Sequence, residues 1–269
     1  MKSATLTTNH LPKQKQLKWG FWFLIIAILF GWAFAGVPFH GFQNSAAEIS
    51  KSIMYGIFHP DWAYVYDGSG EDLVGLTLQT LAMAFLGTFI SALLSVPFAF
   101  WAARKGSQRI HLRSTSGKVV LTLIRTFPEI VLAIMFIKAV GPGSFAGVLA
   151  VSVHSIGMLG KLFSESIENM DGGPGEALTS AGGNHAQTLT FATLPTVIPE
   201  FLSYTLYRFE IAVRSASILG MVGAGGIGTP LLFAIQTRSW SRVGIILLGI
   251  IVTVTLIDFV SGSIRKRLV

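Results

Sequence analysis

The longest uncharged run of the chain extends from Leu73 to Ala103, and it limits the possible folds more than any other feature. Its 31 residues include no Asp, Glu, Lys or Arg. As a helix rising 1.5 Å per residue, the run would be about 46 Å long. About 20 apolar residues suffice to cross a bilayer core of about 30 Å. The run therefore predicts a membrane-spanning helix that tilts or projects beyond the core, and Pro97 is a place for a kink.

Further apolar segments repeat this pattern along the chain, at residues 19–37, about 119–140, 145–167, about 197–219 and 243–260. Only 12% of the residues are charged, against about 25% in ordinary globular domains. We expect an all-α polytopic membrane protein with about six transmembrane helices and no separate soluble domain. The sequence Ala33-Phe34-Ala35 has the form of a signal-peptide cleavage site. Because the run is longer than a usual signal-peptide core, we interpret it as the first span.

Basic residues gather at one predicted membrane face, where both termini and the connection between the second and third spans lie. They are Lys2, Lys13, Lys15, Lys18, Arg104, Lys105, Arg109, Arg113, Lys118, Arg265, Lys266 and Arg267. The opposite loops hold only Lys51, Arg238 and Arg242 as basic residues. The positive-inside rule then predicts that both termini are cytoplasmic. The net charge of +7 thus fits membrane lipid as a partner, and nucleic acid is not expected.

A polar segment with the sequence EALTSAGGNHAQTLTFATLP occupies residues 176–195, between two hydrophobic blocks on the cytoplasmic side. We expect a short helix, a turn at Gly182-Gly183, and a second short helix ending at Leu194-Pro195. The segment resembles the EAA loop of ABC importer permeases, although Leu178 and Ala192 depart from that pattern. The matching residues are Glu176, Ala177, Gly182, Leu194 and Pro195. The resemblance implies contact with an ATPase, and a plain amphipathic loop is the alternative.

Several other stretches are similar to the permease subunit of phosphonate and phosphite ABC importers. These stretches are residues 58–61, 141–149, 203–210, 213–216 and 220–228. The resemblance implies a type I ABC importer permease with the MetI-like fold in a bacterial inner (plasma) membrane. It also implies a homodimer, two cytoplasmic ABC ATPase subunits and an extracytoplasmic substrate-binding protein. The chain would bind no cofactor, because ATP and Mg²⁺ would be used by the ATPase. Permeases for methionine or a quaternary amine, and an ion-coupled secondary transporter, remain alternatives.

These expectations divide the chain into segments that differ in membrane position. We expect a cytoplasmic tail at 1–18, a first span at 19–37, an extracytoplasmic loop at 38–72, a permease core at 73–265 that includes the coupling segment 176–195, and a cytoplasmic tail at 266–269.

Charged residues also occur inside the predicted spans. Arg125 and Glu129 are spaced i,i+4, as are Glu210 and Arg214, with Arg208 nearby, and such pairs share one helix face. A charge near the bilayer centre costs about 2.5–3.5 kcal/mol on insertion scales and usually faces protein or water. We expect these residues to line a translocation pathway, with Arg208 or Arg214 easing the passage of an anion. The alternative is that the pairs neutralise one another and hold helices together.

The remaining motifs predict structure rather than catalysis. The glycines Gly223, Gly225, Gly226 and Gly228 match GxGxxG, but a dinucleotide site needs a preceding strand and a following acid. We expect them to permit close helix approach or a bend near the outer gate. His154 is interpreted as a helix-packing histidine rather than a proton relay. Cysteine is absent, and neither a metal-ligand cluster nor a nucleophile-base spacing is present, so no metal site or catalytic residue is expected.

Overall fold

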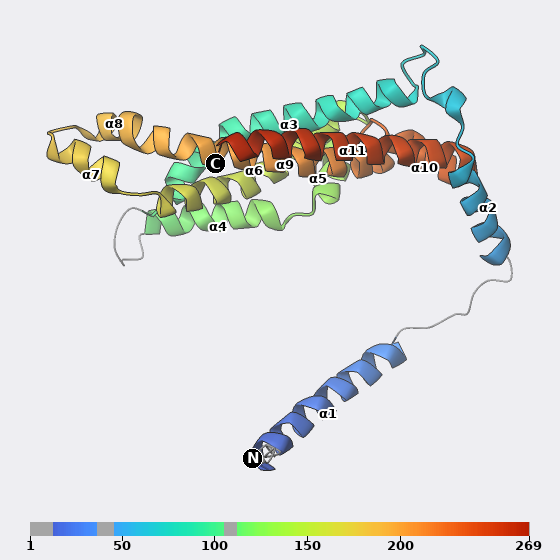
Figure 1. Ribbon diagram of the computed structural model, residues 1–269, viewed down its shortest axis with the longest axis horizontal. Coiled ribbons are helices and arrows are strands. Elements are labelled where there is room, and N and C mark those ends of the chain that lie inside the picture. The colour runs from blue at the N-terminus through green and yellow to red at the C-terminus, as the bar shows by residue number, and fades with distance from the viewer. Residues whose placement is uncertain (1–12, 37–45, 105–111, 269) are drawn as a thin grey trace, which may run out of the picture. The chain divides into compact units, whose positions relative to one another are not determined.

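The computed structural model describes residues 13–36, 46–104 and 112–268, and every regular element in those ranges is a helix (Figure 1). The chain forms two units, one up to Ile49 and one from Ser50 onward. The first unit holds α1 (Lys13–Gly36) and the beginning of α2 (Ala46–Phe58). The elements of the second unit after α2 are η1 (Trp62–Tyr64), α3 (Leu73–Ala102), α4 (Leu112–Thr126), α5 (Glu129–Val140), α6 (Ser144–Asn169), α7 (Gly173–Ser180), α8 (His185–Thr188), η2 (Leu189–Thr193), α9 (Leu194–Leu219), η3 (Gly220–Val222), α10 (Gly228–Gln236) and α11 (Trp240–Leu268).

All six predicted spans are helical in the described part of the chain. Four helices, α1, α3, α6 and α11, are long and apolar enough to cross a membrane. The helix α9 has 26 residues, which is sufficient length, but its four charged residues lower its hydropathy. Lys2, Lys105, Arg109 and the boundary at residue 37 lie outside the described residues. The prediction of an all-α polytopic membrane protein is confirmed.

The third predicted span is not one continuous helix. It consists of α4 and α5, which meet at an angle of 79°. The break falls at Phe127 and Pro128, and Pro128 has an extended ψ of 134°. Proline cannot donate the backbone hydrogen bond that a continuous helix would require at this position, and its ring disfavours a helical conformation in the residue before it. The apolar segment at about 119–140 was expected to form a single span, and this change of direction was not expected.

The core of the second unit is built around α6, which packs against α3, α4, α5 and α9. Small side chains dominate the largest buried cluster, where Ala84, Ala133, Ala150, Ala212 and Ala216 are all fully buried. In the membrane, small residues allow helix backbones to approach closely and gain dispersion contacts. This packing places the intramembrane charges of α5 and α9 beside one another.

The two ends of the second unit differ in structure (Figure 1). One end carries α7 and α8, which project beyond the long helices, and the other carries α2 and α10. At the latter end Asp72 caps α3, because its Oδ1 accepts a hydrogen bond of 2.7 Å from Gly75 N. Its other carboxylate oxygen accepts from the backbone N–H groups of Asp67 and Gly68. Asp72 therefore fixes both the loop and the beginning of α3.

Candidate functional site

The segment 176–195 forms a helical hairpin at one end of the long helices, and the predicted turn at Gly182-Gly183 is confirmed. The helix α7 ends at Ser180, and Gly182 has a φ of +88°, a conformation that costs glycine little. Gly183 N donates to Leu178 O at 2.9 Å. Leu178, a departure from the EAA pattern, thus lies against the turn.

The second half of this hairpin differs from the prediction. The helix α8 begins with a capping box, in which Gln187 N donates to Asn184 Oδ1 at 2.9 Å and Asn184 N donates to Gln187 Oε1 at 2.8 Å. It then continues through the π-helical turn η2 into α9 without ending at Leu194-Pro195. Proline is tolerated in the first turn of a helix, where its missing N–H has no intrahelical partner. The hairpin is therefore continuous with a membrane helix.

The side chains that matched the EAA pattern lie mostly at the surface. Glu176, Ala177, Gly182 and Pro195 are exposed, whereas Leu194 is half-buried. Phe191 in η2 is 72% exposed, although it was not singled out from the sequence. A large exposed aromatic side chain on a projecting hairpin is typical of protein interfaces. This surface can accept a partner without rearrangement of the core.

In the structure Glu129 of α5 pairs with Arg208 of α9 and not with Arg125. The distance from Arg208 Nη2 to Glu129 Oε2 is 3.4 Å. Arg208 is 2% exposed, and its Nε also donates to Ser155 Oγ at 2.7 Å. The expected shared face of Arg125 and Glu129 is wrong, because the break after Thr126 turns α5 away from α4. Arg208 thus links α9 to α5 through Glu129 and to α6 through Ser155.

The pair Glu210 and Arg214 is also divided between other partners. Glu210 is 5% exposed and accepts a hydrogen bond of 2.6 Å from Arg265 of α11. Arg214 pairs with Asp258 of α11 at 3.1 Å, and both side chains are almost half exposed. The alternative that Glu210 and Arg214 neutralise one another is therefore wrong, although both residues do lie at i,i+4 on α9. The sequence analysis missed Asp258 and the role of Arg265, since neither is near its partner in sequence.

Arg125 and His154 lie near the break between α4 and α5. His154 Nδ1 is 3.1 Å from Phe127 O, so the prediction of a hydrogen-bonded packing histidine is confirmed. Arg125 is exposed, and within residues 13–36, 46–104 and 112–268 it has no ion-pair partner within 4.0 Å. Of the three arginines predicted to lie in the spans, Arg208 and Arg214 form ion pairs with carboxylates, and Arg125 forms none in the described ranges.

The glycine-rich stretch 220–228 forms a loop held to two other elements. Gly223, Gly225 and Gly226 have φ values of +99°, +81° and +76°. Gly226 N donates to Gln79 Oε1 at 3.2 Å, and Ile227 N donates to Thr80 Oγ1 at 2.9 Å. A second tie runs from Gly143 N to Gly223 O at 3.0 Å.

Gly228, the last glycine of this stretch, lies where helices α9 and α10 approach most closely. A Cβ on Gly228 would overlap Ser217 O and come within 2.7 Å of Met221 N. Close approach is observed at Gly225, Gly226 and Gly228 but not at Gly223, where the atom nearest to an added Cβ would be Ile137 Cδ1 at 3.8 Å. Within the described ranges, no group of three or more His, Asp or Glu side chains could hold a metal ion.

The fold defines a multi-pass helical membrane protein with an exposed helical hairpin at one end. Residues 95–269 match the family described as "Binding-protein-dependent transport system inner membrane component". The chain belongs to this family, and it is therefore a membrane-embedded transport subunit rather than an enzyme. Membership implies that a binding protein and an ATPase act with it.

Similar proteins agree with this assignment. The phosphite transport system permease protein PtxC of Stutzerimonas stutzeri is 42% identical over 190 residues, which cover 71% of this chain and 69% of that protein. The putative cryptic phosphonate transport system permease protein PhnE2 of Escherichia coli is 44% identical over 121 residues, covering 45% of this chain and 99% of that protein. A structure of the MetNI methionine ABC transporter in an inward-facing conformation has a TM-score of 0.63 at 20% identity, covering 73% of this chain and 96% of that one. This last similarity shows the fold alone.

Proposed function

We propose that this permease translocates oxyanions of the phosphite and phosphonate class across a bacterial inner membrane. The observation that carries the proposal is the 42% identity to a phosphite permease over 71% of the chain. The likeness to the methionine transporter is limited to the fold at 20% identity. An oxyanion substrate also fits a protein whose intramembrane arginines include one, Arg125, without a matched carboxylate in the described ranges.

The hairpin of α7 and α8 acts in this proposal as the contact for the ATPase, with both termini on the same cytoplasmic side. Its exposed residues Glu176 and Ala177 would enter a groove on the ATPase, and Gly182 would set the angle between the two arms. Because η2 continues directly into α9, displacement of the hairpin would move the helix that carries Arg208 and Arg214. ATP and Mg²⁺ would be bound by the ATPase subunits, and this chain would bind neither.

A second copy of the chain completes the pathway in this proposal. Arg214 and Asp258 are 49% and 44% exposed on helices that we place in the membrane. Charged groups at that depth are costly in contact with lipid and usually face protein or water. We infer that this face of α9 and α11 lies toward a homodimer partner or the central aqueous cavity. Arg125 would face the same cavity, whereas the buried Arg208 would hold the cavity wall in place.

The test is an assay of the purified complex reconstituted in proteoliposomes with its ATPase and binding protein. We expect ATP hydrolysis and uptake to be stimulated by phosphite or methylphosphonate and not by methionine or glycine betaine. Stimulation by methionine alone would overturn the substrate class. Uptake driven by an ion gradient, without ATPase or ATP, would overturn the ABC mechanism.

A further inference from the structure

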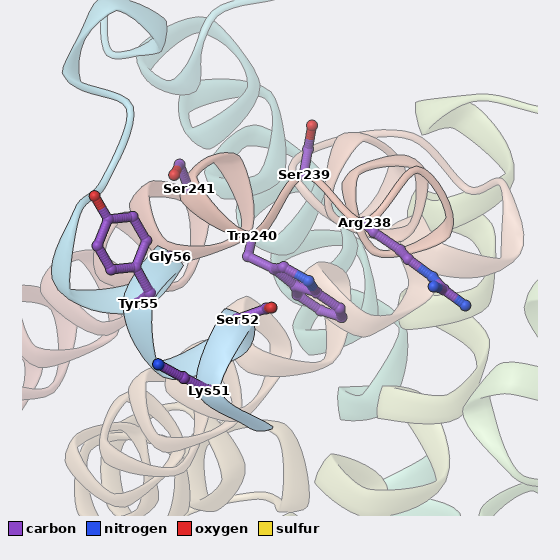
Figure 2. A pocket seen from close by; sticks show the side chains of 8 residues that line it. All are labelled: Lys51, Ser52, Tyr55, Gly56, Arg238, Ser239, Trp240 and Ser241. Atoms are coloured by element: carbon purple, nitrogen blue, oxygen red, sulfur yellow. The ribbon is translucent and has the colours of Figure 1, made fainter. Parts of the chain in front are cut away.

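A groove of about 480 Å³ lies at the end of the second unit opposite α7 and α8. It is lined by Lys51, Ser52, Tyr55, Gly56, Arg238, Ser239, Trp240 and Ser241. These residues come from α2, from the turn after α10 and from the beginning of α11. Figure 2 shows the indole of Trp240 in the middle of the group, with the cationic side chains of Lys51 and Arg238 extending on either side of it. The volume is in the range of about 300–1,000 Å³ that is usual for small-molecule sites.

The side chains that line the groove are rich in hydrogen-bond donors and include no carboxylate. Lys51 and Arg238 are exposed, and neither has an ion-pair partner within 4.0 Å in the described ranges. The hydroxyl groups of Ser239 and Ser241 and the indole N–H of Trp240 are further donor groups in the lining. Asp61, an acid in the loop after α2, is 4.0 Å from Arg242, and neither residue lines the groove. A groove of this composition favours an anion with several acceptor oxygens.

Arg238 occupies a position where glycine would be the least strained residue. Its φ is +55°, and it is the one non-glycine residue with positive φ in the described ranges. Arg238 N donates to Ile235 O at 3.1 Å and Ser239 N donates to Ala234 O at 2.9 Å. These two bonds form a Schellman motif, in which the left-handed position usually holds glycine. Arg238 therefore occupies this position although glycine would avoid the strain of a positive φ.

The floor of the groove is preformed by direct contact between α2 and α11. A Cβ added to Gly56 would overlap Trp240, and a Cβ added to Gly244 would lie 2.7 Å from Gly56 O. The two helices thus meet backbone to backbone at Gly56. This contact holds Trp240 against α2 without a bound partner, which lowers the entropic cost of binding.

We propose that this groove is an entry site that holds a phosphite or phosphonate anion on the extracytoplasmic side before it reaches the membrane cavity. The inference rests on the proposed function, from which the side of the membrane and the substrate class are taken. The exposed cationic side chains of Lys51 and Arg238 would attract and contact the oxyanion by charge-assisted hydrogen bonds. The fixed donors on the floor would then orient its oxygens.

The experiment measures phosphite binding to the full chain in lipid nanodiscs by titration calorimetry at constant ionic strength. The test variants are Arg238→Gly and Lys51→Gln. Glycine fits the left-handed position, so Arg238→Gly should not lower the thermal unfolding temperature. Arg242→Gln is the matched control, since it removes one positive charge from the same end of α11 but lies outside the groove. We expect about tenfold weaker binding in each test variant and unchanged binding in the control.

Three results would overturn the entry site. The first is the absence of phosphite binding to the wild-type chain at millimolar concentration. The second is equal weakening in Arg242→Gln, which would indicate a general effect of charge. The third is unchanged phosphite affinity in Arg238→Gly together with weaker capture of the binding protein, which would make the groove a protein-docking surface. Failure of the proposed function is distinguishable, because it would show as a wild-type complex whose ATPase responds to no oxyanion.

Discussion

At Gly182 the backbone conformation restricts substitution, whereas the space around the residue does not. Its φ is +88°, and a Cβ at this position would meet no atom within 4 Å. A left-handed conformation costs an ordinary L-residue about 1–2 kcal/mol, and asparagine tolerates it better than β-branched residues do. The residue thus sets the angle of the hairpin through φ alone.

For this reason we expect Gly182→Val to impair coupling between the ATPase and the permease. The β-branched side chain would reopen the turn and displace the α7 arm that carries Glu176. The measurement compares ATPase co-purification and the ratio of uptake to ATP hydrolysis in the reconstituted complex. Gly182→Asn is the control and should retain most coupling. Normal coupled uptake in Gly182→Val would refute the assignment of this turn.

The buried pair of Arg208 and Glu129 gives a second prediction at the residue scale. Glu129 Oε1 is buried without a hydrogen-bond partner in the described ranges, and Oε2 depends on Arg208. Arg208→Gln would leave the carboxylate without its cation, and breaking a buried pair costs about 3–5 kcal/mol. Thermal unfolding in detergent should show a marked loss of stability. The double variant Arg208→Met, Glu129→Leu should recover much of it. A fully stable Arg208→Gln protein without uptake would instead place Arg208 in the pathway.

The residue types of the intramembrane charges could be identified from the sequence, but their partners could not. Arg125, Glu129, Glu210 and Arg214 do lie on helices of the second unit. The i,i+4 spacing was compatible with pairing of Glu210 and Arg214 within one helix. In the structure Glu210 pairs with Arg265 and Arg214 pairs with Asp258, and both partners lie on α11, more than forty positions away. Spacing along one helix describes which residues share a face. Which helix covers that face depends on tertiary packing.

At the scale of elements, the sequence predicted the helices better than the places where they change. The apolar runs located α3, α6 and α9 within three residues, whereas α11 continues to Leu268, beyond the expected end at residue 260. The 79° break between α4 and α5 was not expected, because Pro128 is compatible with either a kink or a change of direction. The π-turn η2 likewise has no signal in hydrophobic periodicity. The helices α4 and α5 both pack against α6, and η2 contacts α7, α8 and α9, so tertiary contacts accompany both features.

The glycine-rich loop permits a test of close approach between elements. In Gly228→Ala the new methyl group would meet Ser217 O and the backbone at Met221, neither of which can rotate away. We expect α10 to lose its position on η3 and the yield of folded protein to fall strongly. In Gly223→Ala the nearest atom would be Ile137 Cδ1 at 3.8 Å. This control incurs only the cost of positive φ, about 1–2 kcal/mol.

Size-exclusion profiles of the two glycine variants, after extraction from the membrane, provide the measurement. We expect a monodisperse peak for Gly223→Ala and aggregation or loss for Gly228→Ala. A monodisperse Gly228→Ala protein would mean that the contact of α10 with the end of α9 and with η3 does not require glycine at this position.

At the scale of the whole molecule, the second unit combines a fixed wall with an exposed charged face. The fixed wall contains Arg208 and Glu129, which are buried between α5, α6 and α9. The charged face carries Arg214 and Asp258, which remain accessible on α9 and α11. The composition of the chain predicted a membrane protein, but it does not indicate which helix face a partner covers. The exposure of an ion pair on a membrane helix supports the proposal that this face lies toward a partner or an aqueous cavity.

We therefore expect Arg214→Gln to reduce oxyanion uptake while the complex still assembles. Asp258 would lose its cation, but its exposed position lets water solvate the carboxylate, so folding should be little affected. Lys161→Gln is the control, because Lys161 and Glu165 form an exposed i,i+4 pair (3.4 Å) on α6 that the proposed pathway does not use. The measurement pairs uptake in proteoliposomes with co-purification of the ATPase. Unchanged uptake would remove Arg214 from the pathway, and loss of assembly in Arg214→Gln alone would place this pair at the interface between the two copies.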